Sequence, residues 1–134
     1  MGIYIDERAV IAAVLDDGWT ACRVAWPDQD FTVPSPTNDK ASPASYIAVE
    51  IDYDEIRQVD FAGGAQINGR VEHRIWVERC AGDYLVRSYM DTLRGLYAAA
   101  SSTSITFLEP TVGAAVIEGE WYGRAYSVPF VRFG

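Results

Sequence analysis

Four carboxylates lie close together near the middle of the chain, at Glu50, Asp52, Asp54 and Glu55. The pair Asp52 and Asp54 could bind a divalent cation, because hard cations prefer oxygen ligands. The segment lacks the loop glycine and the distal glutamate that an EF-hand requires. Alternate residues of a strand share one face of a sheet. We therefore expect a solvent-exposed acidic face here and no metal site.

The segment from Gly64 to Val71 has the glycine spacing of a phosphate-binding P-loop. Arg70 stands where that motif has lysine, and Val71 has no hydroxyl to offer magnesium. The segment also runs into a predicted strand, so no helix N-terminus would face a phosphate. We interpret it as a hairpin turn with Asn68-Gly69 as the turn signal, and we expect no nucleotide or other cofactor.

His73 is the only histidine, so a Ser-His-Asp or Cys-His mechanism would have to use it. No Gly-x-Ser-x-Gly sequence is present. A zinc site needs three or four ligands, and Cys22 and Cys80 are far from His73 in the sequence. His73 falls on the apolar side of its predicted strand. We expect a structural histidine with satisfied ring nitrogens, and a protein that is not an enzyme.

The charge and the apolar runs of the chain argue against nucleic-acid and membrane partners. The 134 residues carry 19 acidic and 11 basic side chains, a formal net charge of −8, and the basic residues are scattered. Tight nucleic-acid binding and a polybasic membrane patch both need clustered Lys and Arg. The longest apolar run, Ala9 to Leu15, is too short to span a bilayer. The acidic N-terminus does not resemble a signal peptide, so we expect reduced thiols, a cytoplasmic setting and no membrane partner.

Hydrophobic periodicity predicts two helices. Apolar residues at helical spacing predict a helix over 4–15, ended by Asp16-Asp17-Gly18. A second helix is predicted over 84–100, with Asp83 as its N-cap. Its apolar stripe consists of Val86, Tyr89, Met90, Leu93, Tyr97 and Ala100.

The strand pattern predicts the fold class. Strands are expected over 21–26, 46–51, 56–61, 70–80, 104–108, 114–117 and 121–133. In the 70–80 strand we expect one buried side and one exposed side, the exposed side carrying Glu72, Arg74, Trp76 and Glu78. The order of elements predicts an α+β fold: an antiparallel or mixed sheet with two amphipathic helices packed on it, in one domain over 1–134.

A long loop separates the first two predicted strands. Residues 27–43 hold four of the six prolines and no apolar period. Long loops in small domains are usually functional or mobile. Side chains that could reach a neighbour lie here and beside a late turn: Trp26, Asp30, Phe31, Pro34, Trp121 and Tyr122. Aromatic residues are common at protein contacts, but packing in the core explains them equally well.

Several local patterns together resemble a known family. The helix over 4–15 precedes a strand that runs into Trp-Pro-Asp-Gln-Asp-Phe at 26–31. Ser-Tyr-Ile-Ala-Val at 45–49 follows the proline-containing loop. The strand Gly-Arg-Val-Glu-His-Arg-Ile-Trp-Val precedes Gly82 and the second helix, and the chain closes on the strand that starts at Glu120-Trp121-Tyr122. Over nearly its whole length the chain resembles the tail terminator (tail completion) proteins of long-tailed bacteriophages.

The resemblance implies a virion protein at the head-proximal end of the tail, assembled in the host cytoplasm. Its members form a ring, usually of six copies, that caps the tail tube, stops its polymerisation and offers a surface to head-completion or connector proteins. Sheet edges could pair between copies. We expect Asp52 and Asp54 to face an acidic lumen through which DNA passes without binding. The alternatives are a head–tail connector or neck subunit, and a small ligand-binding or enzymatic domain.

Overall fold

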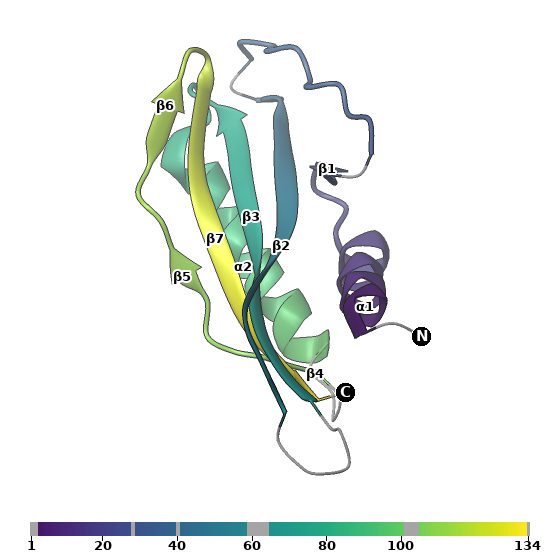
Figure 1. Cartoon of the computed structure of the whole chain (residues 1–134). Helices are drawn as coiled ribbons and strands as arrows, with labels where there is room; N and C mark the ends of the chain where they lie inside the picture. The colour runs from purple at the N-terminus through teal and green to yellow at the C-terminus, as the bar shows by residue number, and fades with distance from the viewer. Residues whose placement is uncertain (1–2, 28, 40, 59–64, 101–104, 134) are drawn as a thin grey trace.

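A mixed sheet and two helices make up the protein, as the computed structural model in Figure 1 shows. The structure describes residues 3–27, 29–39, 41–58, 65–100 and 105–133, although not every side chain within them. Within these ranges the elements are α1 (Ile3–Gly18), β1 (Arg23–Ala25), β2 (Ser45–Gln58), β3 (Ala65–Glu78), α2 (Gly82–Ala100), β4 (Ile105–Phe107), β5 (Thr111–Val112), β6 (Val116–Glu118) and β7 (Trp121–Phe133). The predicted α+β fold is confirmed.

Three long strands form the centre of the sheet. The strand order is β1-β2-β3-β7-β4, and β5 and β6 also pair with β7. β1 runs parallel to β2, and every other pairing is antiparallel. Val71 of β3 lies between Ile51 of β2 and Val128 of β7. This register puts the apolar side chains of all three strands on one face.

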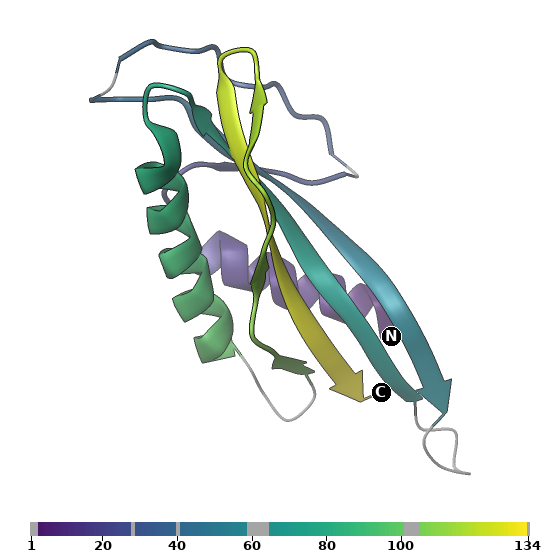
Figure 2. The same cartoon turned by 90° about the vertical axis from the view of Figure 1, so that its left-hand side faces the viewer.

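Both helices contribute to the single apolar core on that face (Figures 1 and 2). Each fully buried aliphatic side chain stabilises the fold by about 1.5–3 kcal/mol relative to exposure. The buried set includes Ile11 and Leu15 of α1, Ile47 and Val49 of β2, Val71 and Ile75 of β3, Val86, Leu93 and Tyr97 of α2, and Val128 and Phe130 of β7.

The apolar stripe predicted for α2 is confirmed, with Ala100 at its half-buried end. The helix begins at Gly82, so Asp83 lies in the first turn and the predicted N-cap position is wrong. The Asp83 carboxylate accepts hydrogen bonds from Tyr122 and Arg124 of β7 and from Arg87 of its own helix. These bonds, led by the one from Tyr122, hold the pKa of Asp83 well below its usual range. Asp83, which the sequence predicts as an N-cap, thus connects the start of α2 to β7 through side-chain hydrogen bonds.

The turn predicted at Asn68-Gly69 is wrong, because both residues lie inside β3. Gly69 is buried, and a Cβ atom there would lie 2.8 Å from the Phe130 ring. The glycine is needed for close packing, so it does not mark a turn. The turn signals at 62–64 lie outside the described residues.

The strand predicted over 56–61 is not separate as far as it is described. β2 continues to Gln58 across an irregularity between Tyr53 and Glu55, where Asp54 has no register partner on β3. A β-bulge of this kind shifts the alternation by one residue, so an unbroken strand looks interrupted in the sequence.

The ends of the other helices and strands differ from the predicted ends by a few residues. α1 extends to Gly18, and β1, β4 and β6 occupy parts of the predicted strands at 21–26, 104–108 and 114–117. β5 was not predicted, because two paired residues are too short for a pattern. Residues 27–43 have no helix or strand in the described part of the chain, as predicted. Both cysteines are free thiols. None of the described helices is long and apolar enough to cross a membrane.

Candidate interaction surface

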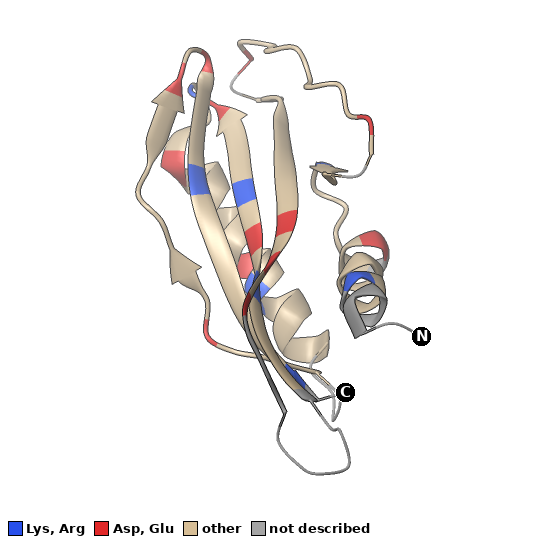
Figure 3. Ribbon diagram, viewed as in Figure 1, with Lys and Arg blue, Asp and Glu red and all other residues tan. Residues whose placement is uncertain are grey.

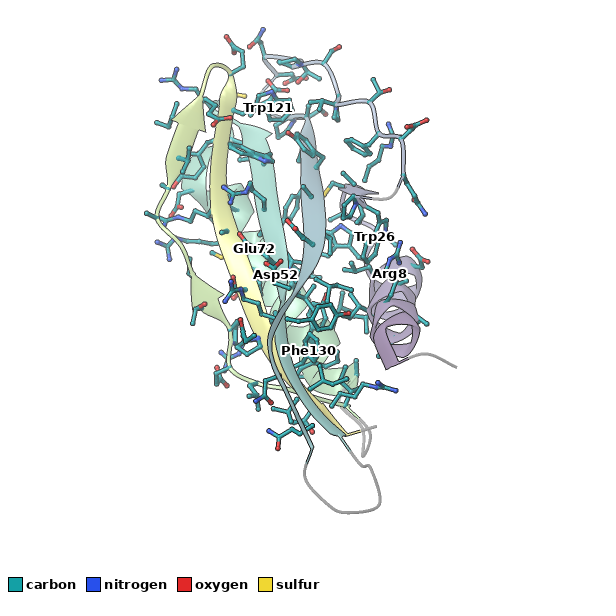
Figure 4. All side chains as sticks on the ribbon, viewed as in Figure 1. Arg8, Trp26, Asp52, Glu72, Trp121 and Phe130 are labelled. Carbon is teal, nitrogen blue, oxygen red and sulfur yellow. The ribbon has the colours of Figure 1, made fainter. Side chains whose placement is uncertain are left out.

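The sheet face opposite the helices is not covered by either helix, and we call it the open face (Figure 2). Side chains of the three central strands alternate between the core and this face. Its charged members are Glu50, Asp52 and Asp54 of β2 and Arg70, Glu72 and Arg74 of β3 (Figures 3 and 4). Four carboxylates against two guanidinium groups leave this part of the face with a formal charge of −2.

Asp52 and Asp54 both form ion pairs with Arg70 on the open face. Arg70 Nε lies 3.8 Å from Asp52 Oδ2, and Arg70 Nη1 lies 3.3 Å from Asp54 Oδ1. The side chains are a third to half exposed, so each pair contributes at most about 1 kcal/mol to stability. No group of three or more His, Cys, Asp or Glu side chains in the described part of the chain could hold a metal ion. The two aspartates therefore belong to a charge-paired surface of the sheet.

Aromatic side chains gather at the end of the open face where β2 begins. The rings of Tyr46 and Trp121 meet edge to face with centroids 5.3 Å apart, and the centroid of the Phe31 ring lies 5.6 Å from that of Tyr46. Trp76 is the register partner of Tyr46, and its ring covers Gly123. We call Phe31, Tyr46, Trp76 and Trp121 the aromatic cluster. The structure thus brings together the predicted contact residues Phe31 and Trp121, from positions 90 residues apart in the sequence.

Trp26 is buried and does not project from the molecule. The guanidinium of Arg8 stacks on its ring, 3.6 Å from the centroid. Figure 4 shows the two residues side by side between α1 and the sheet. Trp26 and Pro27 line a pocket of about 240 Å³ together with Glu50, Glu72 and Arg74 of the central strands. Of the two explanations for Trp26, a contact with a partner or packing in the core, its burial supports packing in the core. The pocket beside it includes residues of the open face.

Tyr122 points away from Trp121, because consecutive residues of β7 face opposite sides of the sheet. Its hydroxyl donates a hydrogen bond of 2.6 Å to Asp83 of α2. The structure therefore separates Tyr122 from the aromatic cluster and gives it a part in helix packing.

Glu78 of β3 forms hydrogen bonds with the loop at 27–43, which we call the proline-rich loop. Its Oε1 accepts hydrogen bonds from the backbone N–H groups of Thr37 (2.6 Å) and Ala44 (2.7 Å) and from the Thr37 hydroxyl (2.8 Å). Its Oε2 accepts one from the N–H of Asn38 (2.8 Å). Burial alone would raise the pKa of the Glu78 carboxyl, but these hydrogen bonds lower it to about 2. On the same loop, Asp30 is exposed and Pro34 is half-buried.

The prediction that one whole side of β3 is exposed is partly wrong, because the hydrogen bonds to the loop bury Glu78. Trp76 and Glu78 are buried, whereas Arg74 is exposed and Glu72 is half-buried. Alternation places all four on the open face, but at one end Glu78 is hydrogen-bonded to Thr37, Asn38 and Ala44. The Trp76 ring packs on Gly123. No local pattern marks Glu78, because its partners lie 34 to 41 residues away.

His73 confirms the prediction of a satisfied structural histidine. It is fully buried, and both ring nitrogens have partners, the Tyr97 hydroxyl and the Tyr126 carbonyl. Burial lowers its pKa to about 4, against the effect of the hydrogen bond to Tyr126. The Cys22 thiol is also partly buried, and burial raises its pKa, which makes it a poor nucleophile.

A surface that was not predicted lies at the far edge of the sheet. Residues 108–118, which we call the edge ribbon, run along β7 and include β5 and β6 (Figure 1). The ribbon carries exposed large apolar side chains: Leu108, Val112, Val116 and Ile117. An available signal in the sequence was the uncharged stretch Pro-Thr-Val-Gly-Ala-Ala-Val-Ile at 110–117.

Comparison with known proteins identifies the fold and no family. No family model matches the chain, and no curated protein does. A solved structure superposes over 98% of this chain and 96% of its own, with a TM-score of 0.69 and 18% sequence identity. At that identity the likeness shows a shared fold alone, and the neighbour's name states neither an activity nor a partner.

Proposed function

We propose that this protein is a structural subunit of a phage tail, which forms a ring of six copies on the tail tube. The ring ends polymerisation of the tube and presents its other side to a head-completion or connector protein. The observation that carries this proposal is the sheet itself. Its helices occupy one face, and both of its edges carry stretches without a strand neighbour among the described residues. Such edges favour assembly by strand pairing.

In this ring the open face lines the lumen. Asp52, Asp54, Glu50 and Glu72 outnumber Arg70 and Arg74 there, so the wall keeps a negative charge. A negative wall repels DNA phosphates, and DNA passes without binding. Arg70 shields the two aspartates, so the repulsion is weaker than the acidic sequence suggests. A ring whose lumen is basic or apolar would contradict this arrangement.

The aromatic cluster and the proline-rich loop lie together at one end of the three long strands (Figure 1). If the strands run along the ring axis, this end is one of the two rims. Three rings of the cluster, those of Phe31, Tyr46 and Trp121, are half-buried. Such a rim suits contact with a protein partner, since aromatic rings bury a large area at small entropic cost. We assign the rim to the tube or the connector protein.

The mass of the protein tests the proposal. We expect a species of six times 14.8 kDa by analytical ultracentrifugation, either alone at high concentration or after addition of tube subunits. A protein that stays monomeric in both cases is not a ring subunit. A ring that binds the connector protein and leaves the tube growing would instead indicate a neck subunit.

A further inference from the structure

The edge ribbon exposes an unusual amount of apolar surface for a sheet edge. Its four large apolar side chains are all exposed, and Val112 and Ile117 are the most exposed of them, at 53% and 58%. Residues 110–117 carry no charge. Natural sheets protect their edges with charged side chains or a covering element, because an apolar edge pairs with other chains. The ribbon therefore has the properties of a strand that another chain covers.

The two most exposed of these side chains lie on the same face of the sheet. Val112 is opposite Tyr126, which is buried in the core. Ile117 is opposite Tyr122, which donates a hydrogen bond to Asp83 of α2. Directly opposed residues on neighbouring strands point to the same face. Val112 and Ile117 thus both lie on the helix face, where the side chains of an added strand would cover them.

The backbone of the ribbon is open to pairing on its outer side. The N–H of Gly113 donates a hydrogen bond of 2.8 Å to the carbonyl of Ala125 on β7. Backbone groups of successive strand residues point to alternate sides, so the N–H and C=O groups of Val112 point outward. Within the described ranges, no strand pairs with this outer side. Figure 2 views the ribbon from outside and shows no described helix or strand in front of it. An extended segment therefore has room to add to the sheet here.

Charges at the two ends of the ribbon indicate which kind of segment fits. At the start, Arg94 of α2 already contacts both carboxylate oxygens of Glu109, at 3.1 and 3.2 Å. At the other end, the exposed residues Glu118 and Glu120 form no ion pair within the described part of the chain. An antiparallel segment, which forms the more stable kind of pair, begins beside this end. A lysine or arginine at its start would balance these carboxylates.

A second copy of the ribbon fits this edge less well. If two ribbons paired antiparallel with their uncharged stretches aligned, Glu118 of each copy would lie opposite Glu109 of the other. Like charges directly opposite each other destabilise a pair of strands. The formal charge of −8 on each copy adds a long-range repulsion. The ribbon therefore favours a segment of a different and more basic chain.

We propose that the edge ribbon binds an extended, apolar segment of another protein, which adds to the sheet as an antiparallel strand and carries a basic residue at its N-terminal end. In this mode of recognition, main-chain hydrogen bonds supply affinity and alternate side chains supply specificity. Val112 and Ile117 select apolar side chains, and Glu118 and Glu120 select the basic residue. The inference goes beyond the proposed ring and does not need it, so either can fail without the other.

A synthetic peptide tests the binding. The probe has a lysine pair at its N-terminus, then about eight residues that alternate valine and threonine, and fluorescein at its C-terminus. Fluorescence anisotropy should show saturable binding to the wild-type protein, and binding at least about tenfold weaker to the variant Val112→Lys/Ile117→Lys. Gln29→Lys/Val33→Lys is the matched control, because it adds the same charge on the proline-rich loop just after β1, the opposite edge strand (Figure 1). This control should bind the peptide as the wild type does.

The charge selection has its own comparison. A second peptide carries a glutamate pair in place of the lysine pair, and the wild type should bind it more weakly. The variant Glu118→Gln/Glu120→Gln should lose most of this preference, because the carboxylates that attract the lysines are gone. An unchanged preference in this variant would show that the ends of the ribbon do not select the partner.

Hydrogen exchange keeps the inference testable if the lysine variant does not fold. In the wild type, the lysine peptide should slow exchange at the outward amide of Val112. Protection confined to other parts of the protein, no saturable binding to the wild type, or equal binding to the wild type and to Val112→Lys/Ile117→Lys would each overturn the inference. A dimer of the free protein that this variant abolishes would also overturn it, because the occupant would then be a second copy.

Discussion

The Nε2 atom of His73 lies 2.7 Å from the hydroxyl oxygen of Tyr97, in the centre of the core. On the other side of the ring, Nδ1 lies 2.9 Å from the carbonyl oxygen of Tyr126. A carbonyl can only accept, so Nδ1 carries the proton, and Nε2 of the neutral ring accepts from Tyr97. The imidazole thereby joins β3 to α2 and β7 through two satisfied hydrogen bonds.

This arrangement predicts a stability that depends on pH. The pKa of His73 is about 4 in the folded protein and 6.5 in an exposed chain. The unfolded chain therefore takes up a proton at a higher pH than the folded protein. The free energy of unfolding should fall as the pH drops from about 6.5 to about 4, by on the order of 3 kcal/mol in total.

Urea denaturation across this pH range measures the effect. The variant His73→Gln lowers stability at every pH, but it should lose the part of the slope between pH 6.5 and 4. An unchanged slope in this variant would show that other groups dominate the acid sensitivity. Below about pH 4.5, Glu78 adds a second decline, because its folded pKa is about 2.

Replacing Glu78 by Gln should release the proline-rich loop. The carboxylate accepts from three backbone N–H groups and one hydroxyl, and an amide group cannot accept at both ends. We expect faster hydrogen exchange at the amides of Thr37, Asn38 and Ala44 and a lower midpoint of thermal unfolding. Glu72→Gln is the control, because Glu72 pairs with Arg74 on the surface. If exchange in the loop is the same in both variants, Glu78 does not hold the loop.

Gly123→Ala should disturb the aromatic cluster. A Cβ atom at this position would lie 2.5 Å from the Trp76 ring and 2.9 Å from the carbonyl oxygen of Ile75. The ring must move, which should destabilise the protein by about 1–3 kcal/mol and change the tryptophan fluorescence.

Gly95→Ala is the matched control for that substitution. Gly95 lies inside α2, and a Cβ atom there would meet nothing within 4 Å. Alanine at such a position should stabilise the helix by about 0.5–1 kcal/mol. Chemical denaturation of the two variants should therefore give changes of opposite sign; changes of the same sign would mean that close packing at Gly123 is not the cause.

Local patterns in the sequence were sufficient to predict much of the fold. The stripe from Val86 to Tyr97 has one periodicity throughout, and it predicted α2 to within two residues at its start. The alternation around His73 predicted the buried side of β3 for the same reason. The bulge after Tyr53 could not be predicted, because an irregularity in pairing depends on the partner strand and not on the residues alone.

The candidate surface was harder to predict, because its parts are distant in the sequence. Phe31 and Trp121 meet only through Tyr46, and Glu78 binds a loop about forty residues earlier. Whether a residue such as Trp26 serves a contact or the core depends on what stacks upon it, here Arg8. The exposure of the edge ribbon could not be predicted from the segment alone, because it depends on how the whole sheet is arranged.

Electron microscopy of tail tubes grown with and without this protein tests the central claim most directly. The account predicts tubes that stop growing and carry a six-subunit ring at one end, with the open sheet faces lining the channel. Tubes that grow to the same length with no added density at either end would contradict it.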